Sequence, residues 1–182
     1  MALKDEIKKR KPFEQPEEEA FLNLFRTTTL LEADFVHLFK RCGLSEPQYN
    51  VLRILRGAGA AGLPSTEIAS RMITRVPDIT RLVDRLETAK LVERCRTPDD
   101  RRVVIVKVTH KGLEALAGLD EPIRKLHQEQ LGHLTRTELG ELNRLLVKAR
   151  QTRDDRPGVT CDGKEFEREK TKSSGGASNG EH

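Results

Sequence analysis

The feature that most constrains the fold is a change of hydrophobic period near residue 90. From about residue 76 to 89 apolar residues recur at the spacing of an amphipathic helix. Residues 91–96 and 103–108 are instead short runs rich in β-branched residues, which is typical of strands. The segment between them, Thr97-Pro98-Asp99-Asp100-Arg101-Arg102, has the Pro-Asp-Asp chemistry of a turn. The sequence therefore predicts a helix followed directly by a β-hairpin with a basic tip.

Two further helices are predicted before this one. Ser45 is the expected N-cap of the first, and the small-residue run at 57–62 is expected to be a connector. Ser65 is the expected N-cap of a short second helix, and the third is expected to begin near Val76, with Pro77 in its first turn. Adjacent helices followed by a hairpin form a winged helix-turn-helix, here residues 45–112.

Charge concentrates in the same region. Residues 71–111 contain eleven Lys and Arg against six Asp and Glu, a net +5, whereas the whole chain carries +4. Such local basicity favours contact with phosphates, and one helix fits the major groove of double-stranded DNA. Asp78 has two roles open to it, as an acceptor from a cytosine amino group or as a local stabiliser of the helix start. The predicted DNA-binding residues of the third helix are Arg75, Pro77, Asp78, Thr80, Arg81 and Arg85.

Long helices flank this module. Residues 17–44 form an amphipathic helix too long for a small domain alone, which favours packing against a partner. Residues 113–150 continue this pattern, with Pro122 expected to kink or split the helix and a capping box starting a new helix at Thr135. Residues 1–16 are expected to be a flexible arm and 151–182 a disordered tail. The expected fold class is mainly α with a small β-hairpin wing.

Several classes of function find no support in the sequence. No apolar run is long enough to span a membrane, and the charged N-terminus is unlike a signal peptide, so a cytoplasmic location is expected. The three cysteines, Cys42, Cys95 and Cys161, form no C-x-x-C motif, and the five histidines form no H-x-x-x-H pair. Neither a phosphate loop nor a G-x-S-x-G motif is present. We expect no enzyme activity, no cofactor and no metal site.

A family resemblance strengthens the assignment. The segment Asp84-Arg-Leu-Glu-Thr-Ala-Lys-Leu-Val-Glu-Arg94, then Asp100-Arg101-Arg102, then Val106-Lys-Val-Thr-His-Lys-Gly112, resembles the signature of MarR-type regulators. The resemblance extends from about residue 17 to 150. It implies an obligate homodimer on a pseudo-palindromic operator. Repression is the favoured outcome because a compact dimer can block polymerase without an activation surface. The resemblance also implies that Asp100 orients the wing arginines and that Arg102 or Arg101 enters the minor groove.

The resemblance carries one departure and two further expectations. Lys90 stands where the family usually has Gly, so it must adopt a left-handed conformation or the turn must differ. The family implies a small phenolic or lipophilic effector, for which the candidate lining residues are Phe35, Phe39, Tyr49 and His127. Two alternatives stay open: a redox-responsive regulator using Cys42 or Cys95, and a winged helix that contacts proteins without binding DNA.

Overall fold

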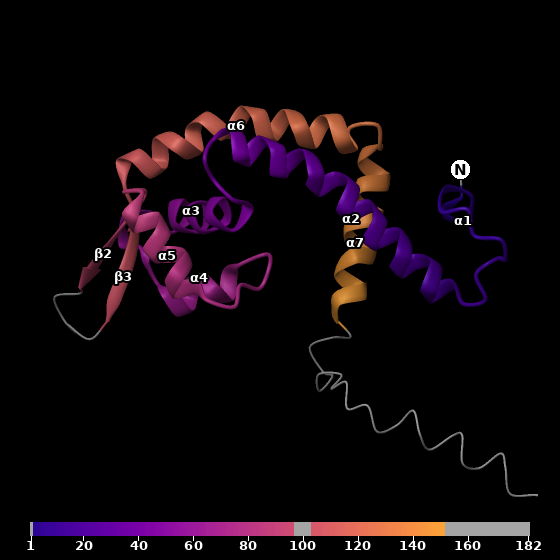
Figure 1. The fold of residues 1–182 in the computed structure, drawn as a ribbon, viewed down its shortest axis with the longest axis horizontal. Helices are drawn as coiled ribbons and strands as arrows, with labels where there is room; N and C mark the ends of the chain where they lie inside the picture. Colours follow the sequence, from indigo (N-terminus) through magenta and orange to yellow (C-terminus); the bar gives the residue numbers. More distant parts are fainter. Residues whose placement is uncertain (1, 97–102, 152–182) are drawn as a thin grey trace, which may run out of the picture. The chain divides into compact units, whose positions relative to one another are not determined.

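The computed structural model describes residues 2–96 and 103–151 (Figure 1). The chain divides into two compact units, residues 1–133 and 134–182. The first unit contains α1 (Leu3–Glu6), α2 (Pro16–Arg41), α3 (Glu46–Ala58), α4 (Ser65–Arg71), α5 (Ile79–Thr88), α6 (His110–Leu131) and a small antiparallel sheet. The second contains α7 (Arg136–Gln151). None of the described helices is long and apolar enough to cross a membrane.

The expected flexible arm contains structure. Residues 3–6 form the short helix α1, and the side chain of Leu3 is buried. Glu6 accepts a hydrogen bond from Arg26 Nε of α2 at 2.8 Å. An ion pair therefore ties this segment to α2, and the burial of Leu3 is a tertiary effect that the polar composition did not predict.

The core of the first unit is aliphatic and forms around α3. Ser45 caps α3 with a complete capping box, because its hydroxyl accepts from Gln48 N and the Gln48 side chain accepts from Ser45 N. Ten side chains are fully buried: Val51, Leu52, Leu55, Ile68, Val83, Leu86, Val92, Val106, Leu116 and Leu119. They come from α3, α4, α5, α6 and both hairpin strands, so the core holds the module together with α6.

The wing hairpin belongs to a three-stranded sheet in the order β1–β3–β2. Strands β2 (Val92–Arg96) and β3 (Val104–Val108) pair along their whole length, from Val92 opposite Val108 to Arg96 opposite Val104. The additional strand β1 (Leu63–Pro64) pairs with β3 after the 3-10 turn η1 (Gly59–Ala61). Because residues 63 and 64 are extended, Pro64 is the N-cap of α4, and the prediction that Ser65 caps it is wrong.

Helix α6 lies beside α2 (Figure 1). Gln130 Nε2 donates to the Leu31 carbonyl at 2.9 Å and to Asp34 Oδ2 at 3.0 Å. Pro122 lies inside α6 without ending it, so the expected split does not occur. Thr109 caps α6, accepting from Gly112 N, and the capping box at Thr135 begins α7 as predicted.

Candidate nucleic-acid interface

Helix α5 has one buried face and one exposed face. Val83 and Leu86 are buried in the core, with Ile79 and Leu82 packed against it. The exposed face carries Thr80, Arg81, Asp84, Arg85 and Thr88. This division matches the predicted recognition helix: apolar burial fixes the helix against α3, α4 and β2 while the polar face stays open to a groove.

The start of α5 lies later than predicted. The helix begins at Ile79, so Arg75 and Pro77 lie in the segment before it and not on it. Asp78 is the N-cap, and its Oδ1 accepts from Arg81 N at 2.9 Å. Of the two roles left open for Asp78, the structure shows the local one: the side chain satisfies a free amide at the helix start.

Ion pairing separates the cations of this region into two groups. Arg71 pairs with Glu67, one turn away on α4. Lys111 Nζ donates to the Ala89 carbonyl at the end of α5. No carboxylate partner is found among the described residues for a second group: Arg75, Arg81, Arg85 and Arg96. Of this group, Arg81 and Arg85 lie on the exposed face of α5, Arg75 lies in the segment before it and Arg96 lies at the end of β2, where phosphates or base edges can pair with them.

Arg94 connects α5 to strand β2. Its guanidinium donates to Asp84 Oδ1 at 2.6 Å and to Glu87 Oε2 at 2.5 Å, and Glu87 Oε1 accepts from the Arg94 amide at 3.2 Å. Burial works against the charge of Arg94, but the hydrogen bonds to Asp84 and Glu87 outweigh it and raise its pKa. These three residues, which we call the Arg94 clamp, therefore tie α5 to β2.

The turn that follows α5 explains part of the family signature. Lys90 has φ 60°, the left-handed conformation that its position requires. Thr109 donates from Oγ1 to the Lys90 carbonyl at 2.8 Å and from its amide to the Leu91 carbonyl at 3.1 Å. A Cβ on Gly112 would lie 2.3 Å from the Leu91 oxygen. Two hydrogen bonds from Thr109 therefore hold the start of α6 against the turn. At position 112 only Gly fits, because any Cβ there would meet the Leu91 carbonyl oxygen.

The wing strands end close to the predicted tip. Arg96 is exposed at the end of β2. Asp100, Arg101 and Arg102 lie outside the described residues. Their roles remain those that the resemblance implies.

The four candidate effector-binding residues come together as packed rings. Phe39 lies 4.7 Å from Tyr49 between ring centroids, and Phe35 lies 5.0 Å from His127 and 6.1 Å from Phe39. Phe39 and Tyr49 are buried, and burial is the main cause that raises the pKa of Tyr49. Of the four, Phe39 also lines an open groove of about 510 Å³ at the junction of α2 and α3.

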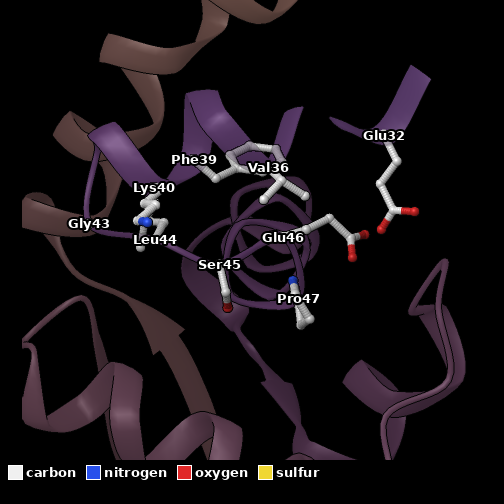
Figure 2. A pocket seen from close by; sticks show the side chains of 9 residues that line it. All are labelled: Glu32, Val36, Phe39, Lys40, Gly43, Leu44, Ser45, Glu46 and Pro47. Atoms are coloured by element: carbon white, nitrogen blue, oxygen red, sulfur yellow. The ribbon is translucent and has the colours of Figure 1, made fainter. Parts of the chain in front are cut away.

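Figure 2 shows this groove from close by, with Glu32 and Val36 of α2 on one side and Glu46 and Pro47 of α3 on the other. Burial, followed by the negative charge of Glu32, raises the pKa of Glu46. Cys42 is exposed at the end of α2 and Cys95 is half-buried on β2, while Cys161 lies outside the described residues. Within the described ranges no group of three His, Cys, Asp or Glu side chains is placed to hold a metal.

The helices α4 and α5, followed by the β2–β3 hairpin, define a winged helix-turn-helix protein. A sequence model of the MarR family matches residues 44–104. The transcriptional repressor IacR of Pseudomonas putida is 33% identical over 109 residues, which make up 60% of this chain and 64% of the repressor. A MarR transcription factor from Planctomyces limnophilus, known from its crystal structure, is 45% identical with a TM-score of 0.58, and the match covers 74% of this chain and 98% of that one.

A variant of MarR from Escherichia coli, crystallised with operator DNA, is 27% identical with a TM-score of 0.60, over 71% of this chain and 95% of that one. The chain belongs to the MarR family of transcriptional regulators. Its relatives are regulators of transcription and not enzymes.

Proposed function

We propose that this protein is a cytoplasmic repressor that binds a pseudo-palindromic DNA operator as a homodimer and is released by a small-molecule effector. The observation that carries the proposal is the exposed face of α5, where Arg81 and Arg85 have no carboxylate partner within the described residues while Arg94 nearby is fully engaged. Unpaired arginines on a helix that is fixed by its buried face are suited to phosphates and guanine edges.

Each half of the module has its own task in this proposal. Thr80, Arg81 and Arg85 enter the major groove, and Arg75 and Pro77 lie where α5 begins. The wing, with Asp100, Arg101 and Arg102, lies along the adjacent minor groove, whose negative potential attracts arginine. Operator DNA bound to the Escherichia coli relative supports the same type of partner for this chain.

Apolar exposure supports the homodimer. Phe21 and Phe25 of α2 stack on each other with 6.5 Å between centroids and are 65% and 66% exposed. Helix α7, described by itself, exposes Leu142, Leu145 and Val147. Large apolar groups on successive turns of a helix are typical of an interface that a partner covers. A dimer also places two recognition helices on two half-sites, as a palindromic operator requires.

The effector proposal rests on the aromatic cluster between α2, α3 and α6. Aromatic walls with one imidazole and one phenol are suited to a small phenolic or lipophilic compound. The cluster joins α2, which exposes the proposed dimer surface, to α3, the first helix of the DNA-binding module. A ligand that separates the rings would therefore change the position of α3 relative to α2.

The test begins with selection of bound fragments from the source genome, followed by titration of the recovered site at several salt concentrations. We expect the logarithm of affinity to fall linearly with the logarithm of salt concentration, with a slope of about −0.9 for each phosphate contacted. Arg81→Ala should change base preference as well as affinity, and Arg102→Ala should weaken binding severely while the dimer survives. A salt-independent affinity, equal on random and selected DNA, would instead support the protein-contact alternative.

The redox alternative is tested on the same DNA. Peroxide should not release the protein from its site if Cys42 and Cys95 have no sensing role. Release by peroxide that is lost in Cys42→Ser or Cys95→Ser would favour the redox mechanism over the small-molecule effector.

A further inference from the structure

A buried amide reaches the segment that connects α4 to α5. Asn50 of α3 is 7% exposed, and it is the buried polar residue among the described core positions. Its Oδ1 accepts a hydrogen bond from the backbone amide of Ile73 at 3.0 Å. Asn50 and Ile73 are 23 residues apart in the chain, so this bond is a tertiary contact between helix α3 and the helix-turn-helix turn.

The connecting segment, residues 72–78, is held at its start by Met72, whose side chain packs against the core. Its other hydrogen bonds within the described chain are local: Met72 N donates to the Ala69 carbonyl, and Asp78 accepts from Arg81 N and Leu82 N. The side chain of Ile73 is 80% exposed and contributes little burial. The bond from Asn50 is therefore the side-chain hydrogen bond that ties the middle of this segment to another element.

Asn50 is itself held firmly on its own helix. The next two residues, Val51 and Leu52, are fully buried. The ring of the preceding residue, Tyr49, packs in a tilted arrangement against Phe39 of α2. The Ser45 capping box fixes the first turn of α3. Because these contacts fix the position of Asn50, its side chain can in turn fix the position of the Ile73 amide that it binds. An amide side chain on a mobile surface turn could not do so.

We propose that Asn50 is a positioning residue for DNA recognition: it fixes the turn of residues 72–78, and through that turn the placement of Arg75 and of the start of α5. The inference rests on the proposed function. Asn50 does not touch DNA in this account. It acts through the Ile73 amide, for which Asn50 Oδ1 is the acceptor found within residues 2–96 and 103–151, so a buried acceptor at position 50 keeps the turn in one conformation.

The first test is Asn50→Leu, which keeps the branched shape and the number of heavy atoms of the side chain and removes the acceptor. Hydrogen exchange of the peptide spanning 72–78 should become at least about tenfold faster in the DNA-free protein, while peptides of α3 and β3 keep their protection. Affinity for the selected DNA site should fall about tenfold, and the salt dependence should lose about one phosphate contact, that of Arg75.

Arg75→Ala supplies the coupling test. If Asn50 acts by placing Arg75, then the double variant should bind DNA within about twofold of Asn50→Leu alone, because the two changes remove the same contact. Losses that multiply would overturn the proposal. Asn50→Asp, which keeps the acceptor oxygen, should retain most of the affinity, and Ile73→Ala should bind normally because only the backbone of Ile73 is used.

A second variant covers the case in which Asn50→Leu does not fold. Ile73→Pro removes the donor from the exposed side of the same bond without touching the core. Met72 has φ −65° and ψ 136°, the extended conformation that a residue before proline needs. This variant should show the same loss of affinity as Asn50→Leu. Normal binding would overturn the proposal. If the wild-type protein binds no DNA, the proposed function fails, while the exchange measurement still decides the role of Asn50.

Discussion

At the scale of single residues, the turn after α5 contains the one family position that this chain fills differently. Lys90 has φ 60°, where a side chain costs about 1 kcal/mol relative to glycine. Lys90→Gly should therefore raise the free energy of unfolding by about 0.5–1 kcal/mol, measured by urea denaturation. Lys125→Gly is the matched control, since Lys125 is exposed inside α6 and the same change should destabilise by about 1 kcal/mol. If both variants changed the free energy of unfolding in the same direction, the left-handed conformation of Lys90 would not be the cause.

Gly112 and Gly118 provide a second pair on one helix. A Cβ at position 112 would meet the Leu91 carbonyl oxygen at 2.3 Å, whereas a Cβ at 118 meets nothing within 4 Å. Gly112→Ala should destabilise the fold by about 2 kcal/mol or more because α6 must move away from the turn. Gly118→Ala should stabilise by about 0.5–1 kcal/mol through helix propensity. Thermal unfolding of both variants compares them directly, and equal midpoints would refute the close contact.

At the scale of elements, the Arg94 clamp joins the recognition helix to the wing. Arg94→Met should lower stability by about 1 kcal/mol and reduce DNA affinity several-fold, because strand β2 loses its attachment to α5. The salt dependence should not change, since Arg94 is occupied by Asp84 and Glu87. Arg96→Met, two residues along the same strand, is the contrast: Arg96 has no carboxylate partner among the described residues, and its loss should remove about one phosphate contact. Equal salt slopes in the two variants would contradict the distinction.

Helices α3 and α6 are joined by a surface ion pair whose effect depends on pH. Arg56 donates twice to Asp120, at 2.8 and 2.9 Å, and these hydrogen bonds are the main cause that lowers the pKa of Asp120. A lowered folded pKa stabilises the protein above the unfolded value of 3.8, and this stability is lost as pH falls through the folded value. Both side chains are more than a third exposed, so Asp120→Asn should cost only about 0.5 kcal/mol at pH 7. In urea titrations the difference should shrink as pH falls below 3.8 and vanish once pH lies below the lowered folded pKa.

Sequence reasoning succeeded where local chemistry decides structure. The caps at Ser45, Thr109 and Thr135 were predictable because each needs only a side chain and an amide three residues away. Three features depend on distant partners and were missed. Strand β1 exists because Leu63 and Pro64 pair with β3, Leu3 is buried by tertiary folding, and Asn50 of α3 binds the Ile73 amide in the segment between α4 and α5. In hindsight, a lone Asn within the apolar run of α3 was the signal for the last.

At the scale of the whole molecule, the proposed function requires two copies of the chain. One recognition helix reads one half-site of the operator. A monomer would therefore lose the additional affinity that arises when two linked recognition helices bind the same DNA molecule. We expect Phe21→Glu combined with Phe25→Glu to produce monomers in sedimentation analysis, because two charges replace stacked rings that are mostly exposed in the single chain. Affinity for a palindromic site should fall by at least about a hundredfold, whereas affinity for an isolated half-site should stay close to that of wild type.

Asn23→Glu controls for the added charge on the same helix, where a polar exposed side chain is already present. It should remain dimeric and bind the palindrome normally. A double Phe variant that stays dimeric would place the interface elsewhere, and one that becomes monomeric yet binds the palindrome fully would show that dimerisation does not contribute to operator affinity. Comparing the palindrome with its half-site therefore separates the contribution of the interface from that of α5, which both variants leave untouched.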